Sequence, residues 1–316
     1  MLPSRAVASR LPKRRFLSAA ASAPPDLEAL DRWIVSDKKL TLSDTLHPEH
    51  VSDLYITLPT RDGTRKPYTA PAAGSPLSYG HHLAFFHPRN PEHTLRADGT
   101  DADFCPPEPF TRRMWAGGRI QWKKPLHVGD SVTAFSEMLD VQKKGFEKGV
   151  PMVFVKQRIE FKRAGSSDVA IEEERSHVYL AAPAYSRGVK QVTDLPAPEF
   201  SFRYRPSATT LFRYSALTFN GHYIHLDKDY ARSEGYPERL VHGPLTALML
   251  LDTAVFHDPD IKIKSFEYRA LNPLVVNKEV TIYGARDIGT EEKAIRVWAV
   301  DEDNIVGMSG RIVVQK

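Results

Sequence analysis

The sequence has little cysteine, no long uninterrupted apolar run and no acidic residue near its beginning. Cys105 is the one cysteine among 316 residues, which excludes an intrachain disulfide and argues against a cysteine-based metal site. The longest apolar candidate, residues 245–256, is interrupted by Asp252 and falls short of the ~18 residues that a membrane-spanning helix needs. We therefore expect no membrane span, and we predict that this segment is a buried core helix.

The positive charge of the chain is concentrated at one end. The whole sequence has a formal net charge of +4 and a pI near 9.0. Residues 1–25 contain four arginines, one lysine and no acid, so they carry +5 and the remaining residues together carry −1. A basic pI raises the question of a nucleic-acid partner, but a nearly neutral body gives that idea no support.

The basic segment has the composition of an organelle address. It is rich in Ser and Ala, lacks acidic residues and ends at Pro24-Pro25. The apolar stretches between its arginines are too short for the core of a secretory signal. We predict that residues 1–25 are a mitochondrial transit peptide cleaved near residues 16–21, which implies the mitochondrial matrix. An unstructured basic arm is the alternative.

Residues 26–185 are predicted to form a first domain of helices followed by a sheet. Asp26 is a suitable N-cap for a helix, and a second helix is expected from Pro48. Turn-forming residues predict loops at 59–76 and 88–112, with a short apolar helix at 77–87 between them. Segments rich in β-branched and aromatic residues predict strands at 118–122, 131–143, 152–162 and 169–180. One face of the 152–162 strand is expected to hold Val153, Val155, Gln157, Ile159 and Phe161.

Residues 199–316 are predicted to form a second domain, after a linker at 181–198. Alternating aromatic residues at 200–204 predict a strand, and 207–219 predicts a helix, followed by a polar loop with a short helix. An apolar helix is expected to open at Gly243-Pro244, because proline suits the first helical turn. Strand segments are predicted at 263–270, 276–286 and 293–314, the last with a turn at 301–304.

An internal repeat relates the two halves. Residues 125–132, Pro-Leu-His-Val-Gly-Asp-Ser-Val, align with residues 273–280, Pro-Leu-Val-Val-Asn-Lys-Glu-Val, at an offset of 148 residues. A repeat of half the chain length predicts two copies of one domain, and a chance match of one short segment is the alternative. A helix that is apolar around most of its surface, followed by long antiparallel strands, predicts a sheet wrapped around that helix. We therefore predict an α+β double hotdog.

The most specific pattern lies at residues 214–231. It reads Tyr-Ser-Ala-Leu-Thr-Phe-Asn-Gly-His-Tyr-Ile-His from Tyr214 to His225. It resembles the hydratase 2 motif of the MaoC-like hydratases and dehydratases. The positions that match this motif in type and spacing are Tyr214, Leu217, Thr218, Ile224, His225 and Ala231. At four further positions the motif has Gly, Asp, Asn and Pro, where this chain has Phe219, Asn220, His222 and Tyr223.

This version of the motif looks like that of the mitochondrial branch, the type 2 hydroxyacyl-thioester dehydratases, and of bacterial relatives that hydrate mesaconyl-type thioesters. The first half is similar to the degenerate hotdog that precedes the catalytic one in such proteins. The resemblance spans nearly all of residues 26–316, but only 214–243 is specific. It implies a hydro-lyase that interconverts (3R)-3-hydroxyacyl and trans-2-enoyl thioesters, with no metal or redox cofactor.

The reaction explains the residue types at three positions. Adding water to an enoyl thioester needs a base for the water, a proton for the α-carbon and a donor to the enolate oxygen. His225 suits the proton transfers, because histidine titrates near neutrality. The family position implies that the N–H of Gly243, unpaired at a helix N-terminus, holds the thioester oxygen. Asn220 orients water but cannot act as an acid or base, so we assign it to positioning; an ordinary turn residue is the alternative.

Other polar residues near the motif are weaker candidates. Those considered for substrate binding are Tyr214, His222, His242, Arg213 and Arg239. The two arginines would meet a phosphopantetheine or a substrate carboxylate, but surface charge is the simpler interpretation of both. A structural role at the helix start is the simpler interpretation of His242. His222 and Asp227 are candidates to share proton transfer, although the spacing does not show that they converge. His81 and His82 are expected to be core or pocket residues.

Four functions stay open on the sequence. The first is dehydration of 3-hydroxyacyl groups on acyl carrier protein in mitochondrial type II fatty acid synthesis. The second is hydration of a mesaconyl-type dicarboxylate CoA thioester, which would need a cation near the far carboxylate. A thioesterase is the third. A non-catalytic subunit that binds acyl carriers is the fourth, because the motif aspartate is missing at Asn220. The partner is expected to be an acyl-ACP or acyl-CoA thioester, and the protein a monomer or homodimer.

Overall fold

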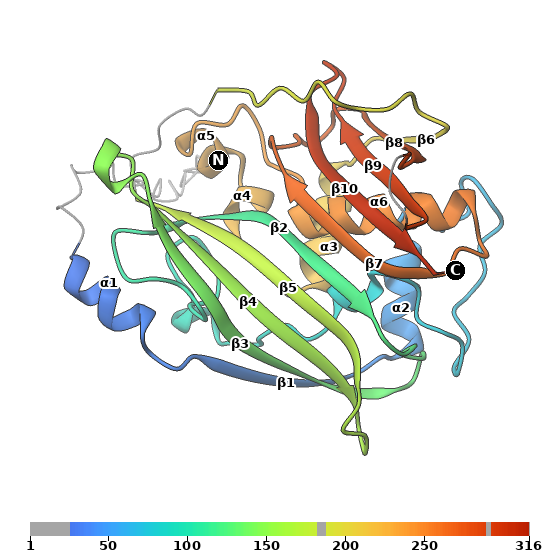
Figure 1. The fold of residues 1–316 in the computed structure, drawn as a ribbon, viewed down its shortest axis with the longest axis horizontal. Coiled ribbons are helices and arrows are strands. Elements are labelled where there is room, and N and C mark those ends of the chain that lie inside the picture. Colours follow the sequence, from blue (N-terminus) through green and yellow to red (C-terminus); the bar gives the residue numbers. More distant parts are fainter. Residues whose placement is uncertain (1–25, 182–187, 289–291, 316) are drawn as a thin grey trace, which may run out of the picture.

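The computed structural model describes residues 26–181, 188–288 and 292–315. Within these ranges the strands form one ten-stranded antiparallel sheet with the order β1-β3-β4-β5-β2-β7-β10-β9-β8-β6 (Figure 1). Each half of the chain supplies five neighbouring strands of this sheet. The predicted transit peptide, residues 1–25, lies outside the described residues.

Most elements follow the predicted order, but the strand at residues 39–45 was not predicted. The first half contains α1 (Leu27–Ile34), β1 (Lys39–Thr45), α2 (Pro48–Tyr55), η1 (His81–Ala84), η2 (Glu92–Thr94), β2 (Arg112–Trp122), β3 (Ser131–Lys144), η3 (Phe146–Lys148), β4 (Met152–Arg163) and β5 (Val169–Leu180). The second half contains β6 (Phe200–Tyr204), α3 (Ala208–Leu217), α4 (Tyr223–Leu226), α5 (Lys228–Ser233), α6 (Gly243–His257), β7 (Ile263–Ala270), β8 (Val280–Arg286), β9 (Ala294–Val300) and β10 (Val306–Val314). Asp26 caps α1 by accepting a hydrogen bond from the Ala29 N–H, and Pro48 is the first residue of α2, as predicted.

The two halves have the same strand order. In each half the first strand lies at the outer edge, followed by the third, fourth, fifth and second, so β2 and β7 meet in the middle of the sheet. Their pairing places Arg119 opposite Glu267, Gly118 opposite Tyr268 and Ile120 opposite Phe266. Arg119 and Glu267 are 148 residues apart, which is the offset of the sequence repeat. The register is therefore symmetric about this pair, and the predicted double hotdog is confirmed.

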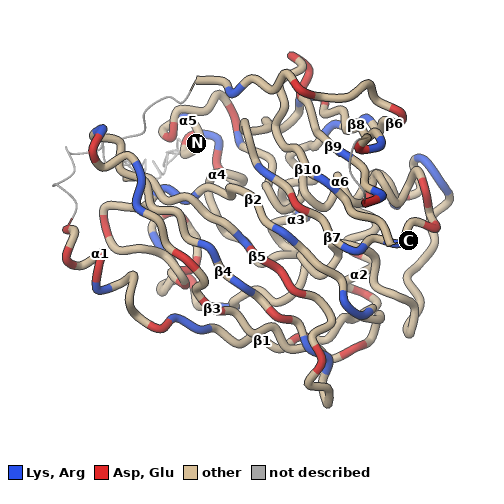
Figure 2. The backbone as a smooth tube through the Cα atoms, in the orientation of Figure 1, with Lys and Arg blue, Asp and Glu red and all other residues tan. Residues whose placement is uncertain are grey.

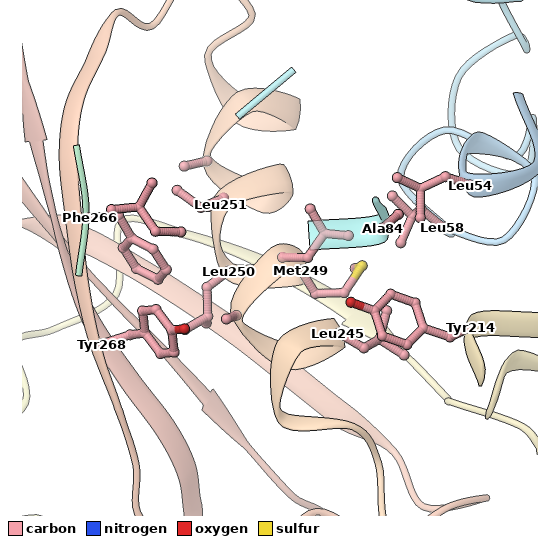
Figure 3. Packing of buried hydrophobic residues seen from close by; sticks show 14 of the residues in the cluster. Leu54, Leu58, Ala84, Tyr214, Leu245, Met249, Leu250, Leu251, Phe266 and Tyr268 are labelled. Carbon is pink, nitrogen blue, oxygen red and sulfur yellow. The ribbon is translucent and has the colours of Figure 1, made fainter. Parts of the chain in front are cut away.

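The core is organised around α6. This helix is apolar on all sides, and its residues from Leu245 to Ala254 are buried. Figure 3 shows Phe266 and Tyr268 on one side of the helix, and Leu54, Leu58 and Ala84 on the other. The central helix of the second half thus packs against strands of its own half and against helical segments of the first half. Because both halves cover α6, its burial holds them together.

The first half has only a single short turn where a short apolar helix was predicted. Residues 77–87 were expected to be helical, but the structure contains only η1 there. The turn begins after Gly80, which has a φ of 80°, and stops at Phe85, which is extended. Phe86 then adopts a φ of 61°, a conformation that does not continue a right-handed helix. The prediction failed because apolar content cannot reveal these backbone conformations.

Strand β2 begins six residues earlier than its predicted start at residue 118. Its register against β5 shifts between Trp115 and Gly117, so the strand contains a bulge. Gly117 has a φ of 152°, and a Cβ there would lie 2.4 Å from the carbonyl oxygen of Tyr268. The glycine permits this close approach of β2 to β7. It also interrupts the apolar alternation by which a strand is recognised in sequence.

A buried carboxylate joins α6 to the first half. Asp252, on α6, is 1% exposed and accepts hydrogen bonds from Arg61 Nε at 2.8 Å and Nη2 at 2.6 Å, and from the Thr60 hydroxyl. His81 Nε2 lies 3.3 Å from the same carboxylate. Burial alone would raise the pKa of Asp252, but Arg61 and His81 hold it well below its usual range. The carboxylate is therefore ionised and is matched by groups from the other half.

Charges of both signs are interspersed over the described part of the molecule (Figure 2). Many of them form exposed ion pairs across neighbouring strands, such as Lys156 with Glu174. In the described ranges, no helix combines the length and the apolar character needed to cross a bilayer.

Candidate active site

The 214–231 motif folds into α3, a tight loop, α4 and α5 beside the N-terminal end of α6. Ser207 begins α3 with a capping box, in which its hydroxyl accepts a hydrogen bond from the Thr210 N–H. The loop after α3 turns at Phe219, which has a φ of 49° and a side chain that is 60% exposed. A bulky residue in this conformation is strained, and such strain is concentrated at functional sites.

His225 has one ring nitrogen bound and the other free of a described partner. Its Nδ1 lies 2.8 Å from the carbonyl oxygen of Leu240. A carbonyl only accepts, so Nδ1 carries the proton and Nε2 has the lone pair of a base. Burial lowers the pKa of His225 to about 4, although the Leu240 carbonyl opposes the shift. The imidazole is therefore neutral at physiological pH and ready to accept a proton at Nε2.

His242 is stacked directly on His225. The two ring centroids are 3.7 Å apart with an angle of 22° between the planes. His242 Nε2 lies 2.9 Å from the Ser215 hydroxyl, and the Tyr214 ring meets His242 edge-on at 5.0 Å. Among the described residues, no partner satisfies the buried His242 Nδ1 or the Tyr214 hydroxyl. Such atoms indicate a place where water or a ligand binds.

Gly243 follows His242 as the first residue of α6. Its N–H lacks an acceptor within the helix because it lies in the first turn. Trp115, on β2, lies against its Cα, and a Cβ at this position would be 2.8 Å from Trp115 Cγ. Only glycine fits beneath the indole. The first half thus helps to shape the backbone donor that the family position implies.

Asn220 has a structural contact that competes with water binding. Its Oδ1 accepts a hydrogen bond of 3.0 Å from the His222 N–H, which closes a turn. This is the turn role that the sequence left as the alternative, and it leaves the amide Nδ2 to hold water. Asn220 also lines a groove of about 320 Å³ together with Asn90, Glu92, Leu95, Asp101, Phe212, Ser215, Ala216, Phe219, Gly221 and Leu226. The groove therefore runs between a loop of the first half and the motif.

The structure brings some of the candidate residues together and leaves others apart. Tyr214, His222 and His242 surround His225, either directly or through one ring. Arg213 is exposed on α3, and its Nη1 donates to the carbonyl oxygen of Ile56 at 3.4 Å. Arg239 is held by its neighbour Glu238 at 3.0 Å. No described hydrogen bond or ring contact connects either arginine to His225.

Sequence reasoning missed two residues of the first half, Trp115 and Asp98. Asp98 Oδ2 lies 3.9 Å from His222 Nε2, on the opposite wall of the site. Both residues lie at least 99 positions from the motif, and nothing in their local sequence indicates that they reach it. In the ranges that the structure covers, no group of three or more His, Cys, Asp or Glu is arranged to hold a metal ion.

Neutral, partly buried histidines predict a loss of stability in mild acid. Burial lowers the pKa of both His225 and His87 to about 4, against about 6.5 in an unfolded chain. Between pH 6.5 and 4 the unfolded state therefore binds more protons than the folded state. The free energy of unfolding decreases as the pH is lowered through this window. Each histidine contributes about 3 kcal/mol over this window, at about 1.4 kcal/mol per pH unit.

The carboxylates do not produce this effect. Burial opposes ionisation of Glu173, but Arg175 and His82 lower its pKa to about 2, so its contribution is lost only as pH falls from about 4.5 towards 2. Urea unfolding at pH 7, 6, 5 and 4.5 should therefore give a midpoint that decreases steadily. A midpoint that is constant from pH 7 to pH 5 would contradict the lowered pKa values of the histidines.

Comparisons with known proteins agree with the fold and the motif. Residues 80–276 match the family described as hydroxyacyl-thioester dehydratase type 2. The chain is 37% identical over 212 residues to mesaconyl-C(4)-CoA hydratase from Chloroflexus aurantiacus, covering 66% of this chain and 74% of the relative. It is 30% identical over 234 residues to the mitochondrial hydroxyacyl-thioester dehydratase type 2 of Schizosaccharomyces pombe, covering 65% and 77%.

Solved structures with little sequence identity share the architecture. A MaoC-like dehydratase from Phytophthora capsici superposes with a TM-score of 0.63 at 13% identity, covering 91% of this chain and 98% of that one. HtdX from Mycobacterium tuberculosis gives a TM-score of 0.60 at 16% identity, covering 86% and 99%. At these identities the likeness establishes the fold alone.

Proposed function

The chain belongs to the hydroxyacyl-thioester dehydratase type 2 family of hydro-lyases, and from this premise we propose that it interconverts (3R)-3-hydroxyacyl and trans-2-enoyl thioesters. One observation carries the proposal. His225 presents an unprotonated Nε2 in a buried site, and its ring stacks on the residue that precedes the α6 N-terminus. A base and a backbone donor in one site are what enolate chemistry needs.

The geometry supports a simple hydration sequence. His225 Nε2 removes a proton from water, and the hydroxide adds to the β-carbon of the enoyl group. The electron pair of the double bond moves to the thioester oxygen, where the Gly243 N–H stabilises the developing charge. The α-carbon then takes a proton, which re-forms the thioester carbonyl. Dehydration is the reverse of these steps.

We propose a mitochondrial setting with acyl carrier protein as the carrier. Two yeast relatives are named mitochondrial, and residues 1–25 of this chain have the composition of a transit peptide. On this proposal residues 26–185 are the degenerate hotdog and residues 199–316 the catalytic one. The active form is then a monomer or a homodimer of this double hotdog.

A second candidate is a dicarboxylate CoA thioester, and one side chain favours it. Arg113, on β2, is close enough to lower the pKa of both His225 and His222, and its own pKa is raised by Tyr179, Cys105 and Asp98 against the effect of burial. An arginine in this position is suited to bind the far carboxylate of a mesaconyl-type group. The relative named mesaconyl-C(4)-CoA hydratase supports the same substrate.

The test is a substrate panel with residues 26–316. Loss of enoyl-thioester absorbance is followed with C4 to C16 enoyl groups on CoA and on ACP, and with mesaconyl-CoA. We expect turnover of the enoyl thioesters without release of free thiol. Faster turnover of mesaconyl-CoA than of crotonyl-CoA would establish the dicarboxylate, whereas release of thiol would indicate a thioesterase. Binding of thioester without any turnover would overturn the proposal in favour of a carrier-binding subunit.

A further inference from the structure

A loop of the first half is docked on the catalytic motif by backbone contacts. The carbonyl oxygen of Asp98 accepts a hydrogen bond of 3.0 Å from the N–H of Tyr223. Next to it, Gly99 and Gly221 face each other so closely that a Cβ on Gly99 would lie 2.3 Å from the Gly221 oxygen. Two facing glycines and a backbone hydrogen bond fix the position of the Asp98 side chain against the motif.

The carboxylate of Asp98 is only half satisfied. Its Oδ1 accepts hydrogen bonds from the N–H of Thr100 at 3.0 Å and from the Thr100 hydroxyl at 2.7 Å. Its Oδ2 is buried and has no hydrogen-bond partner among the described residues. A buried carboxylate oxygen without a partner costs free energy, so its presence calls for an explanation. The side chain that Oδ2 faces is His222, with Nε2 at 3.9 Å.

His222 lies between this carboxylate and His225. Its ring meets the His225 ring edge-on, with 5.5 Å between the centroids. The turn closed by Asn220 Oδ1 fixes its backbone N–H. Burial, His225, Arg113 and Arg96 all lower the pKa of His222 in the free protein, and the Tyr230 ring lies at 6.2 Å. Only Asp98 among these charged neighbours favours a protonated His222.

We infer that His222 is a second catalytic acid and base, and that Asp98 is its positioning residue, supplying from the first half the carboxylate that Asn220 lacks. This inference rests on the proposed hydratase function. It identifies the group that donates a proton to the α-carbon, because His225 and Gly243 alone do not provide a separate donor. It also gives Asn220 a definite part, because the turn that it closes places His222.

The proton balance of hydration closes with this arrangement. His225 accepts a proton from water as the hydroxide bonds to the β-carbon. As Asp98 approaches, its negative charge favours an imidazolium at His222, which carries a proton on each ring nitrogen. His222 delivers the Nδ1 proton to the α-carbon as the enolate electron pair forms the C–H bond, and it keeps the Nε2 proton against Asp98. His225 is then an imidazolium and His222 is neutral. Transfer of the proton from His225 to His222, whose rings meet edge-on, restores the starting state.

The present separation is too long for a hydrogen bond. A distance of 3.9 Å between Asp98 Oδ2 and His222 Nε2 must shorten by about 1 Å to give a charge-assisted hydrogen bond. Catalytic hydrogen bonds are often long in the free enzyme and tighten when substrate binds. Once formed, the bond keeps one proton on Nε2, so the proton that His222 transfers is the one on Nδ1.

The decisive variant is Asp98→Asn in the otherwise intact protein. An asparagine keeps an acceptor for Thr100, but its amide donates to Nε2 and so selects the wrong tautomer of His222. We expect kcat to fall by roughly 100-fold or more with little change in KM. The alkaline limb of the wild-type kcat profile, which reports loss of the proton from the pair, should disappear. Asp103→Asn is the matched control in the same loop, because Asp103 is exposed and does not line the groove, and it should retain wild-type kcat.

A second variant separates catalysis from folding. In Asp98→Ala the space left by the carboxylate is open to a small anion, and added formate should restore at least about 10-fold of the lost rate. A purely structural Asp98 gives no rescue, because formate cannot re-dock the loop. An Asp98→Asn enzyme with the wild-type kcat and the wild-type pH profile would overturn this inference while leaving the hydratase function intact. A wild-type protein that turns over no enoyl thioester would overturn both.

Discussion

Replacing His225 with glutamine is expected to lower kcat for enoyl-thioester hydration by about 1,000-fold, within the 100- to 10,000-fold range of general acid–base catalysis. Glutamine has the length to donate a hydrogen bond to the Leu240 carbonyl in place of Nδ1, so the loop before α6 should keep its position. What it lacks is a nitrogen that accepts a proton at neutral pH. The substrate KM should change little, since binding does not depend on that proton.

Steady-state kinetics with crotonyl-CoA and the thermal midpoint of each protein provide the measurement. His47→Gln is the matched control, because His47 is an exposed histidine before α2 whose side chain makes no capping hydrogen bond. It should retain both activity and stability. If the His225→Gln enzyme is folded and retains wild-type kcat, another residue must act as the base and the proposed mechanism is wrong.

The largest effect on stability is expected at Asp252. Asp252→Leu should lower the free energy of unfolding by about 3–5 kcal/mol, because it leaves the partly buried Arg61 guanidinium without its carboxylate. The substitution at Asp252 removes more than one interaction. Thr60 and His81 also interact with this side chain, and all three partners belong to the first half. Urea unfolding at pH 7 measures the difference.

The double variant Arg61→Met/Asp252→Leu tests the cause. Removing both charges eliminates the unpaired guanidinium, so it should recover at least half of the lost free energy. Asp168→Ala, which breaks the exposed pair with Lys124, is the surface control and should leave the urea midpoint nearly unchanged. A double variant that is less stable than Asp252→Leu alone would show that the unpaired charge is not the reason for the loss.

Patterns of local periodicity predicted α6 and most of the strands, but they missed β1 and the start of β2. In β4 the residues Val153, Val155, Gln157, Ile159 and Phe161 are all buried, as their alternation indicated. The start of α6 at Gly243 followed from the Gly-Pro pair. These predictions succeed because side-chain direction in a strand and proline geometry at a helix start are properties of a few adjacent residues. His81 and His82, expected as core residues, are indeed buried.

The site was predictable only where it lies on one stretch of chain. The motif predicted His225 as a site residue because all residues of the pattern lie on one continuous segment, 214–243. Asp98 and Trp115 reach the site through tertiary contacts, namely the Gly99–Gly221 approach and the packing of an indole on Gly243. No local signal encodes such contacts. The turn that Asn220 closes could be predicted from the sequence. Whether its side-chain amide closes the turn or binds water depends on the positions of its neighbours in the fold.

The symmetric pairing of β2 with β7 has a consequence for how this chain can change. In a homodimer of identical hotdogs, a substitution on one side of the two-fold axis is always repeated on the other. Here the axis passes through Arg119 and Glu267 within a single polypeptide, so each half mutates alone. The first half has a short turn where the second half has its long helix, and a loop of the first half reaches across to the motif of the second. Two copies of the domain in one chain can therefore take different roles in the site, which two identical chains of a symmetric dimer cannot.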